Sequence, residues 1–159
     1  MNPENFGHLL TEASLEVLGD AAFTRAQVVD TPPCFPGYIL SVSVDFRGPT
    51  GEPGWLFLWT SHDCGAQIAC KMLGVDLTEL ESTSQIQTEL CELLNMIGGA
   101  ATCRWFGTQA ICRIGIPRPT PAWTNPPPDL VAEVLLLTET NQGIKLSATL
   151  EGNRAGTPI

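Results

Sequence analysis

Residues Glu89–Ala101 read "ELCELLNMIGGAA", and this stretch decides the fold. Its leucines and isoleucine recur at intervals of three and four residues, which is the spacing of an amphipathic helix. Ser82 and Ser84 are candidate N-caps and Gly107 is a candidate stop, so we expect one long helix that ends at about Phe106. At about 100° per residue, one arc of this helix is apolar and should face a core. That arc contains Ile86, Leu90, Leu93, Leu94, Ile97 and Ala101.

The opposite side of the same helix has a different character. Five residues lie within about 60° of Glu92 on this side, namely Gln85, Thr88, Asn95, Met96 and Gly99. Glu92 and Asn95 are three residues apart and are therefore neighbours on the helix surface. A glycine inside a helix costs about 1 kcal/mol relative to alanine, so packing or access must compensate for Gly98 and Gly99. Two interpretations are open: a solvated face with a close helix crossing, or a ridge that docks onto a partner.

Composition limits the kinds of partner. The chain has 159 residues and a net charge of −9, from 17 acidic and 8 basic side chains. This balance argues against nucleic acid and against an anionic membrane surface, because both are bound through Lys and Arg. No apolar run approaches the roughly 20 residues that cross a bilayer. The first residues are acidic and lack the basic region of a signal peptide, so we expect a cytoplasmic protein.

The six cysteines are scattered, without a CxxC pair or a histidine at zinc-site spacing. They are Cys34, Cys64, Cys70, Cys91, Cys103 and Cys112. We expect them to be reduced and to bind no metal. Cys91 flanks the acidic ridge, where negative neighbours should raise the pKa of its thiol and make it a poor nucleophile.

The rest of the chain alternates between helical and strand patterns. A helix begins near Pro3, and Gly19 is its predicted stop. Period-2 alternation predicts a strand over 38–46, and the aromatic and apolar run over 55–60 predicts a second strand after a turn. A helix then runs from a cap at Ser61 or Asp63 to Gly74. Residues 110–116 read as a strand, 118–128 as an irregular proline-rich crossing, and 130–140 with 143–152 as a hairpin.

Strands that cluster in hairpins predict an antiparallel sheet with long helices packed on one face, which is an α+β fold. A chain of this length fits one domain. We place that domain at residues 1–151 and expect 152–159 to be a loose tail, because it has little apolar content.

The segment "ELLNMIGGAA" resembles the signature helix of the CheC/CheX chemotaxis phosphatases, in which Glu and Asn stand three apart before a glycine-rich turn. The stretches "NPENFGHLLTEASLEVLG" and "GYILSVSVDFRGPTGEPGWLFLWTSHDCGAQIACKMLG" are similar to the opening helix, strand pair and second helix of that family. The resemblance covers about residues 2–117, and one ExxN helix makes CheX the nearer match. Two departures are Thr88, where the family often has Asp or Ser, and the position of a later proline, which Pro117 and Pro119 bracket.

The resemblance implies an enzyme that dephosphorylates the aspartyl phosphate of a CheY-like receiver domain. The receiver would supply its own Mg²⁺ and a lysine, and this chain would need no cofactor. Asn95 would orient the attacking water and Glu92 would pair with the receiver's lysine, while Thr88, Met96 and Gly99 would contact the partner. Phosphoryl transfer suits such residues, because it requires mainly positioning and electrostatic stabilisation.

Two other functions stay open, namely a non-catalytic adaptor that binds a receiver through the same ridge and a structural subunit of a signalling or motor assembly. We also expect a homodimer joined through the late strands, residues 131–151, because an open sheet leaves edges that favour pairing. The adjacent Ser61, His62 and Asp63 do not predict a catalytic triad, since adjacent side chains diverge and an N-cap explains them.

Overall fold

The structure is a computed structural model, and it describes residues 3–121 and 129–150. Its helices are α1 (Pro3–Ala21), α2 (His62–Leu73), a short 3-10 turn (Leu77–Glu79) and α3 (Thr83–Phe106). Its strands are β1 (Ala26–Val28), β2 (Ile39–Arg47), β3 (Pro53–Ser61), β4 (Arg113–Ile114), β5 (Arg118–Pro119), β6 (Leu130–Thr138) and β7 (Gly143–Leu150). These elements confirm the predicted α+β class.

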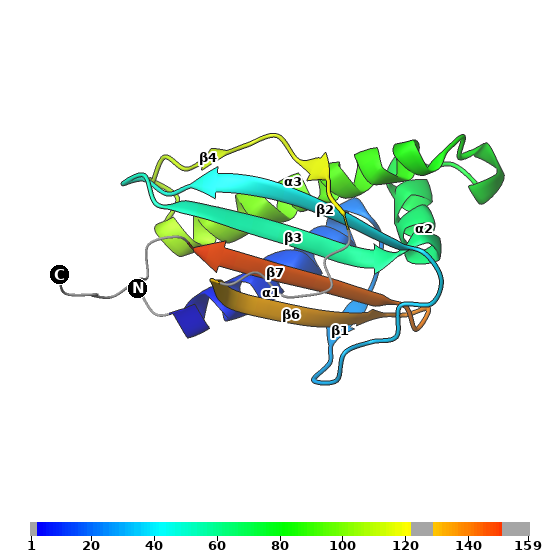
Figure 1. Ribbon diagram of the computed structural model, residues 1–159, viewed down its shortest axis with the longest axis horizontal. Coiled ribbons are helices and arrows are strands. Elements are labelled where there is room, and N and C mark those ends of the chain that lie inside the picture. Colours follow the sequence, from blue (N-terminus) through cyan, green and yellow to red (C-terminus); the bar gives the residue numbers. More distant parts are fainter. Residues whose placement is uncertain (1–2, 122–128, 151–159) are drawn as a thin grey trace.

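All the strand pairs in the described residues are antiparallel. The sheet has the order β1-β6-β7-β3-β2-β4, and β5 also pairs with β2. The two predicted hairpins, β2–β3 and β6–β7, are confirmed, and the pairing of β3 with β7 joins them into one sheet. Figure 1 shows the long helices on one side of this sheet, as predicted.

The ends of α2 and α3 follow the predicted capping chemistry. The Ser61 hydroxyl accepts a hydrogen bond from the Cys64 N–H, and the Ser82 hydroxyl accepts one from the Gln85 N–H. Gly74 ends α2 with φ of 68°, a left-handed conformation that glycine adopts without steric cost. These caps fix where α3 begins, and therefore which of its residues face the sheet.

The predicted end of α1 at Gly19 was wrong by two residues. Leu18 and Ala22 are both fully buried, so core packing carries the helix past the glycine to Ala21. The chain leaves the helical path only at Phe23, which has φ of 46°. The short strand β1 follows, and its sequence gave no period-2 signal because it has only three residues.

The predicted strand over 110–116 was also wrong in extent. Only Arg113 and Ile114 pair with β2, and pairing resumes at β5, inside the stretch predicted to be irregular. The remainder of that stretch, 122–128, lies outside the described residues, as do the predicted tail 152–159 and the edge of the predicted domain. The single domain over 1–151 therefore stays a prediction.

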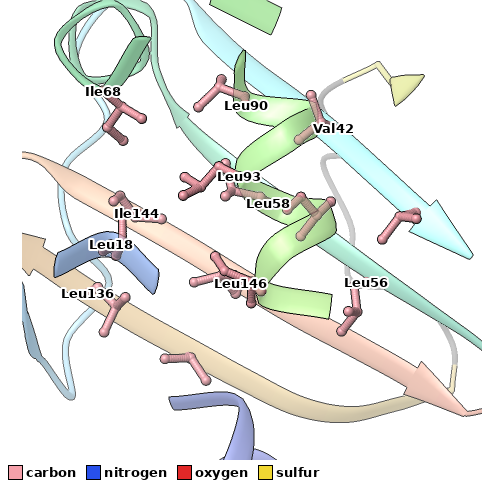
Figure 2. Packing of buried hydrophobic residues seen from close by; sticks show 14 of the residues in the cluster. Leu18, Val42, Leu56, Leu58, Ile68, Leu90, Leu93, Leu136, Ile144 and Leu146 are labelled. Carbon is pink, nitrogen blue, oxygen red and sulfur yellow. The ribbon is translucent and has the colours of Figure 1, made fainter. Parts of the chain in front are cut away.

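The core lies between the sheet and the helices. Figure 2 shows Leu18 of α1, Ile68 of α2 and Leu93 of α3 facing Leu58 and Leu146 of the central strands. All six residues of the apolar arc predicted for α3 are buried. The helix is thereby held in one rotational setting about its axis, and its opposite ridge must face outward.

The predicted dimer elements have unequal access to a partner. Strand β7 is paired on both sides, with β3 and with β6. Strand β6 is covered by β1 only over Leu136–Thr138, while the rest of its outer edge has no strand beside it in the described residues. A homodimer stays a prediction, and β6 is the late strand with edge available for it.

Candidate functional site

The five residues predicted for the site lie along the outward side of α3. Glu92 and Thr88 are exposed, whereas Asn95, Met96 and Gly99 are half-buried. The structure brings all five together because they share one face of one helix. The site is thus a convex ridge, which suits insertion into a partner better than enclosure of a small ligand.

The two polar side chains at the centre of the ridge are unpaired. Within residues 3–121 and 129–150, neither the Glu92 carboxylate nor the Asn95 carboxamide has a hydrogen-bond or ion-pair partner. Some polar residues of α3 are engaged: the Thr88 hydroxyl donates to the Ser84 carbonyl at 3.0 Å, and Arg104 pairs with Glu16 of α1. Gln87 and Glu89 also lack a partner among the described residues, so what distinguishes Glu92 and Asn95 is their position three residues apart on the outward ridge.

One thiol and one carboxyl group beside the ridge have raised pKa values. Burial raises the pKa of the Cys91 thiol to about 11. The direction agrees with our expectation, but the cause is desolvation and not the acidic neighbours. Burial, followed by repulsion from Glu92, raises the pKa of the Glu89 carboxyl. A thiol with a raised pKa is mostly neutral at physiological pH, so Cys91 is a poor candidate for a nucleophile.

The paired glycines have different surroundings. A Cβ added at Gly98 would lie 3.1 Å from Leu56 Cδ1, which is closer than most real contacts. A Cβ added at Gly99 would lie 3.8 Å from Ile114 Cδ1, an ordinary van der Waals distance. Gly98 thus allows α3 to approach the sheet closely, whereas nothing within the described residues requires a glycine at 99.

Sequence reasoning missed the neighbour of the ridge. Helix α3 contacts both β4 and β5 at the edge of the sheet, so the ridge is flanked by the segment from Arg113 to Pro119. The signal was present in "CRIGIPRP", where apolar residues alternate before two prolines, but register with β2 was needed to place it.

One cavity in the described part of the protein lies away from the ridge. It has a volume of about 500 Å³ and lies between the start of α2 and the start of α3. His62, Gln67, Leu80 and Ile86 are among its lining residues, and none of the five ridge residues lines it. In the described part of the chain, no group of three His, Cys, Asp or Glu side chains is placed to hold a metal, and no helix is long and apolar enough to cross a membrane.

Comparison with solved structures identifies the fold as that of CheX and CheC-like proteins. The chain is similar to the chemotaxis protein CheX from Vibrio vulnificus, with 13% identity, a TM-score of 0.72, and coverage of 95% of this chain and 99% of that chain. It is similar to CheX from Desulfovibrio desulfuricans, with 15% identity, a TM-score of 0.67, and coverage of 92% and 99%.

A third similarity is to a chain in the CheX–CheY–BeF3–Mg²⁺ complex from Borrelia burgdorferi, with 14% identity, a TM-score of 0.64, and coverage of 91% and 97%. No family model matches the sequence, and no curated protein matches it. At these identities the likeness establishes a shared fold, and it confirms the CheX-like architecture that the ExxN helix predicted.

Proposed function

We propose that this chain is a protein phosphatase that hydrolyses the aspartyl phosphate of a CheY-like receiver domain. The observation that carries the proposal is the unpaired Glu92–Asn95 ridge on a helix held in the CheX fold. A CheX structure solved with CheY, BeF3 and Mg²⁺ supports the choice of partner.

Asn95 performs the chemical step in this proposal. Its carboxamide oxygen accepts a hydrogen bond from a water while its NH₂ group donates to the phosphoryl oxygens. The water is thereby held in line with phosphorus, and the aspartate leaves as a carboxylate. A strong base is unnecessary, because phosphoryl transfer depends mainly on position and electrostatic stabilisation.

Glu92 performs the docking step. One turn before Asn95 on the same ridge, its carboxylate is free to pair with a lysine of the receiver. That pair sets the depth at which α3 enters the partner and so places Asn95 over the phosphoryl group. Thr88, Met96 and Gly99 contact the surrounding receiver surface, and Mg²⁺ belongs to the receiver. The location is the cytoplasm, where receivers act.

The test is a phosphate-release assay. The protein is added in catalytic amounts, with Mg²⁺, to each phosphorylated receiver domain of the source organism. At least one receiver should lose phosphate faster than it does alone. If a receiver binds but keeps its own phosphate lifetime, the non-catalytic adaptor is the correct function. If no receiver binds or responds, both the enzyme and the adaptor are rejected.

A further inference from the structure

The edge of the sheet beside α3 is an irregular strand. Strand β4 places Ile114 opposite Phe46, and β5 places Arg118 opposite Ser43. Three steps along β2 therefore match four steps along the edge segment, which is the signature of a β-bulge. Figure 1 shows β4 along the sheet edge next to β2 and α3.

The bulge turns one large apolar side chain outward. Gly115 lies in the bulge, and a Cβ there would overlap the Asp45 carboxylate, so that side chain would have to move. The next residue, Ile116, is 87% exposed, which is the highest value among the large hydrophobic residues that the structure describes. A single exposed isoleucine is ordinary on a protein surface, so its position must carry the argument.

That position is next to the ridge. A Cβ on Gly99 would contact Ile114, and Ile116 follows two residues later, about 7 Å along the strand. On the helix, Asn95 is one turn before Gly99 and turned about 40° from it. The segment that carries Ile116 therefore runs alongside the half of the ridge that carries Asn95, since α3 contacts both β4 and β5.

The backbone of this edge is poorly suited to pairing with another strand. Pro117 and Pro119 have no N–H to donate, and Arg113 and Arg118 are exposed charges, both of which are common protections of sheet edges. What the edge offers to a partner is the side chain of Ile116. Such a contact requires an apolar patch on the partner and no strand addition.

We infer that Ile116 is a docking contact for the same receiver domain, and this inference rests on the proposed function. The receiver would carry an apolar patch beside its aspartyl phosphate, and Ile116 would cover that patch when Asn95 reaches the phosphoryl group. Ile116 touches no reacting atom, so it contributes to binding and to the choice of receiver and leaves the chemical step unchanged.

The test compares two exposed β-branched residues on opposite edges of the sheet. Ile116→Ala should raise KM for the phosphorylated receiver about tenfold with kcat unchanged, since interface hot spots contribute on this scale. The same variant should weaken binding to the receiver loaded with beryllofluoride and Mg²⁺ by the same factor. Val28→Ala, on β1 and 51% exposed, is the matched control and should change neither value.

Ile116→Val keeps most of the apolar surface and should retain nearly wild-type KM. Equal KM values for Ile116→Ala, Val28→Ala and the wild type would overturn the inference, and so would a loss in kcat alone. Failure of the proposed function gives a different result: the wild-type protein would then leave the phosphate lifetime of every receiver unchanged, and only the binding measurement with the beryllofluoride-loaded receiver would still report on Ile116.

Discussion

The two faces of α3 are built from the same helix under different constraints. On the inner face, Leu90, Leu93 and Leu94 are fully buried, and their identity is explained by the core that they fill. On the outer face, Glu92 and Asn95 have no partner among the described residues. Core packing explains the inner face, whereas no contact within the described residues explains why Glu92 and Asn95 stand on the outer face.

The difference between the two faces is clearest at the adjacent glycines Gly98 and Gly99. They are adjacent and carry the same helix-propensity cost of about 1 kcal/mol. At Gly98 the cost is explained by the close approach to Leu56, while at Gly99 there is room for a methyl group. A cost that the fold does not require indicates a requirement from outside the fold, which is what a docking ridge predicts.

The largest expected effect is a loss of stability when a buried residue of the inner face is truncated. Leu94→Ala removes a fully buried side chain and should lower the free energy of unfolding by about 2–5 kcal/mol, from lost transfer energy and the remaining cavity. Urea denaturation followed by circular dichroism measures it. Glu92→Ala is the control on the other face of the same helix and should stay within about 0.5 kcal/mol of the wild type. Similar losses for the two variants would contradict the assignment of faces.

The next largest effect is a loss of dephosphorylation rate when Asn95 of the outer face is truncated. Asn95→Ala should slow receiver dephosphorylation about a hundredfold, or about 3 kcal/mol, because one positioned polar group is lost at the transition state. Receiver binding and the thermal midpoint should be nearly unchanged. Gln87→Ala removes another carboxamide of the same helix, about 80° around it from Asn95 and about 140° from Glu92, and should keep full activity. A wild-type rate for Asn95→Ala would reject the mechanism even though the fold stands.

Glu92→Ala should behave differently from Asn95→Ala, because it breaks a charge pair with the receiver. Affinity should fall by about 1 kcal/mol, roughly fivefold in Kd, with a parallel fall in kcat/KM. The loss should shrink in high salt, which screens the pair. Titration of the receiver at two ionic strengths measures this, and a loss that does not depend on salt would exclude the ion pair.

The sequence was sufficient to predict both faces of α3, because a 24-residue helix repeats its pattern many times and its caps fix its ends. The same holds for β2, β3 and β7, which are nine, nine and eight residues long. It was not sufficient for β1, β4 and β5, whose three or two residues carry no period. These short strands form through pairing with distant partners, which local pattern does not encode.

Some residues of the candidate site could be placed from the sequence, and others could not. Glu92, Asn95 and Gly99 could be placed by angular arithmetic alone, since they share one helix. Ile116 could not, because it lies in a bulge that becomes visible only in the register of the edge segment with β2. The fate of Met96 was also hidden: it lies on the ridge but packs partly against the core.

A smaller effect sharpens the contrast between the two glycines. Gly99→Ala should raise the free energy of unfolding by about 0.5–1 kcal/mol, because helix propensity improves and the new methyl group fits. Gly98→Ala should be less stable than Gly99→Ala, since its methyl group presses on the buried Leu56. Receiver affinity should show the opposite order, with Gly99→Ala the weaker binder. Chemical denaturation and receiver titration of both variants measure the two orders.

The smallest effect concerns repulsion within the outer face. Glu89 and Glu92 are three residues apart, and burial together with this repulsion raises the pKa of Glu89 in the folded protein. The folded state therefore holds this proton more tightly than the unfolded state does, so stability falls as pH rises from the ordinary glutamate pKa through the raised value.

Glu89→Gln should stabilise the protein by about 0.2–0.5 kcal/mol at neutral pH, and the gain should disappear in acid. Glu92→Gln relieves only the repulsion and leaves the half-buried Glu89 carboxyl able to ionise, so unfolding measured against pH should show a smaller gain than in Glu89→Gln. Activity should separate them, because Glu89→Gln keeps the docking carboxylate and Glu92→Gln loses it. Equal activity in the two variants would mean that the ridge carries charge without using it.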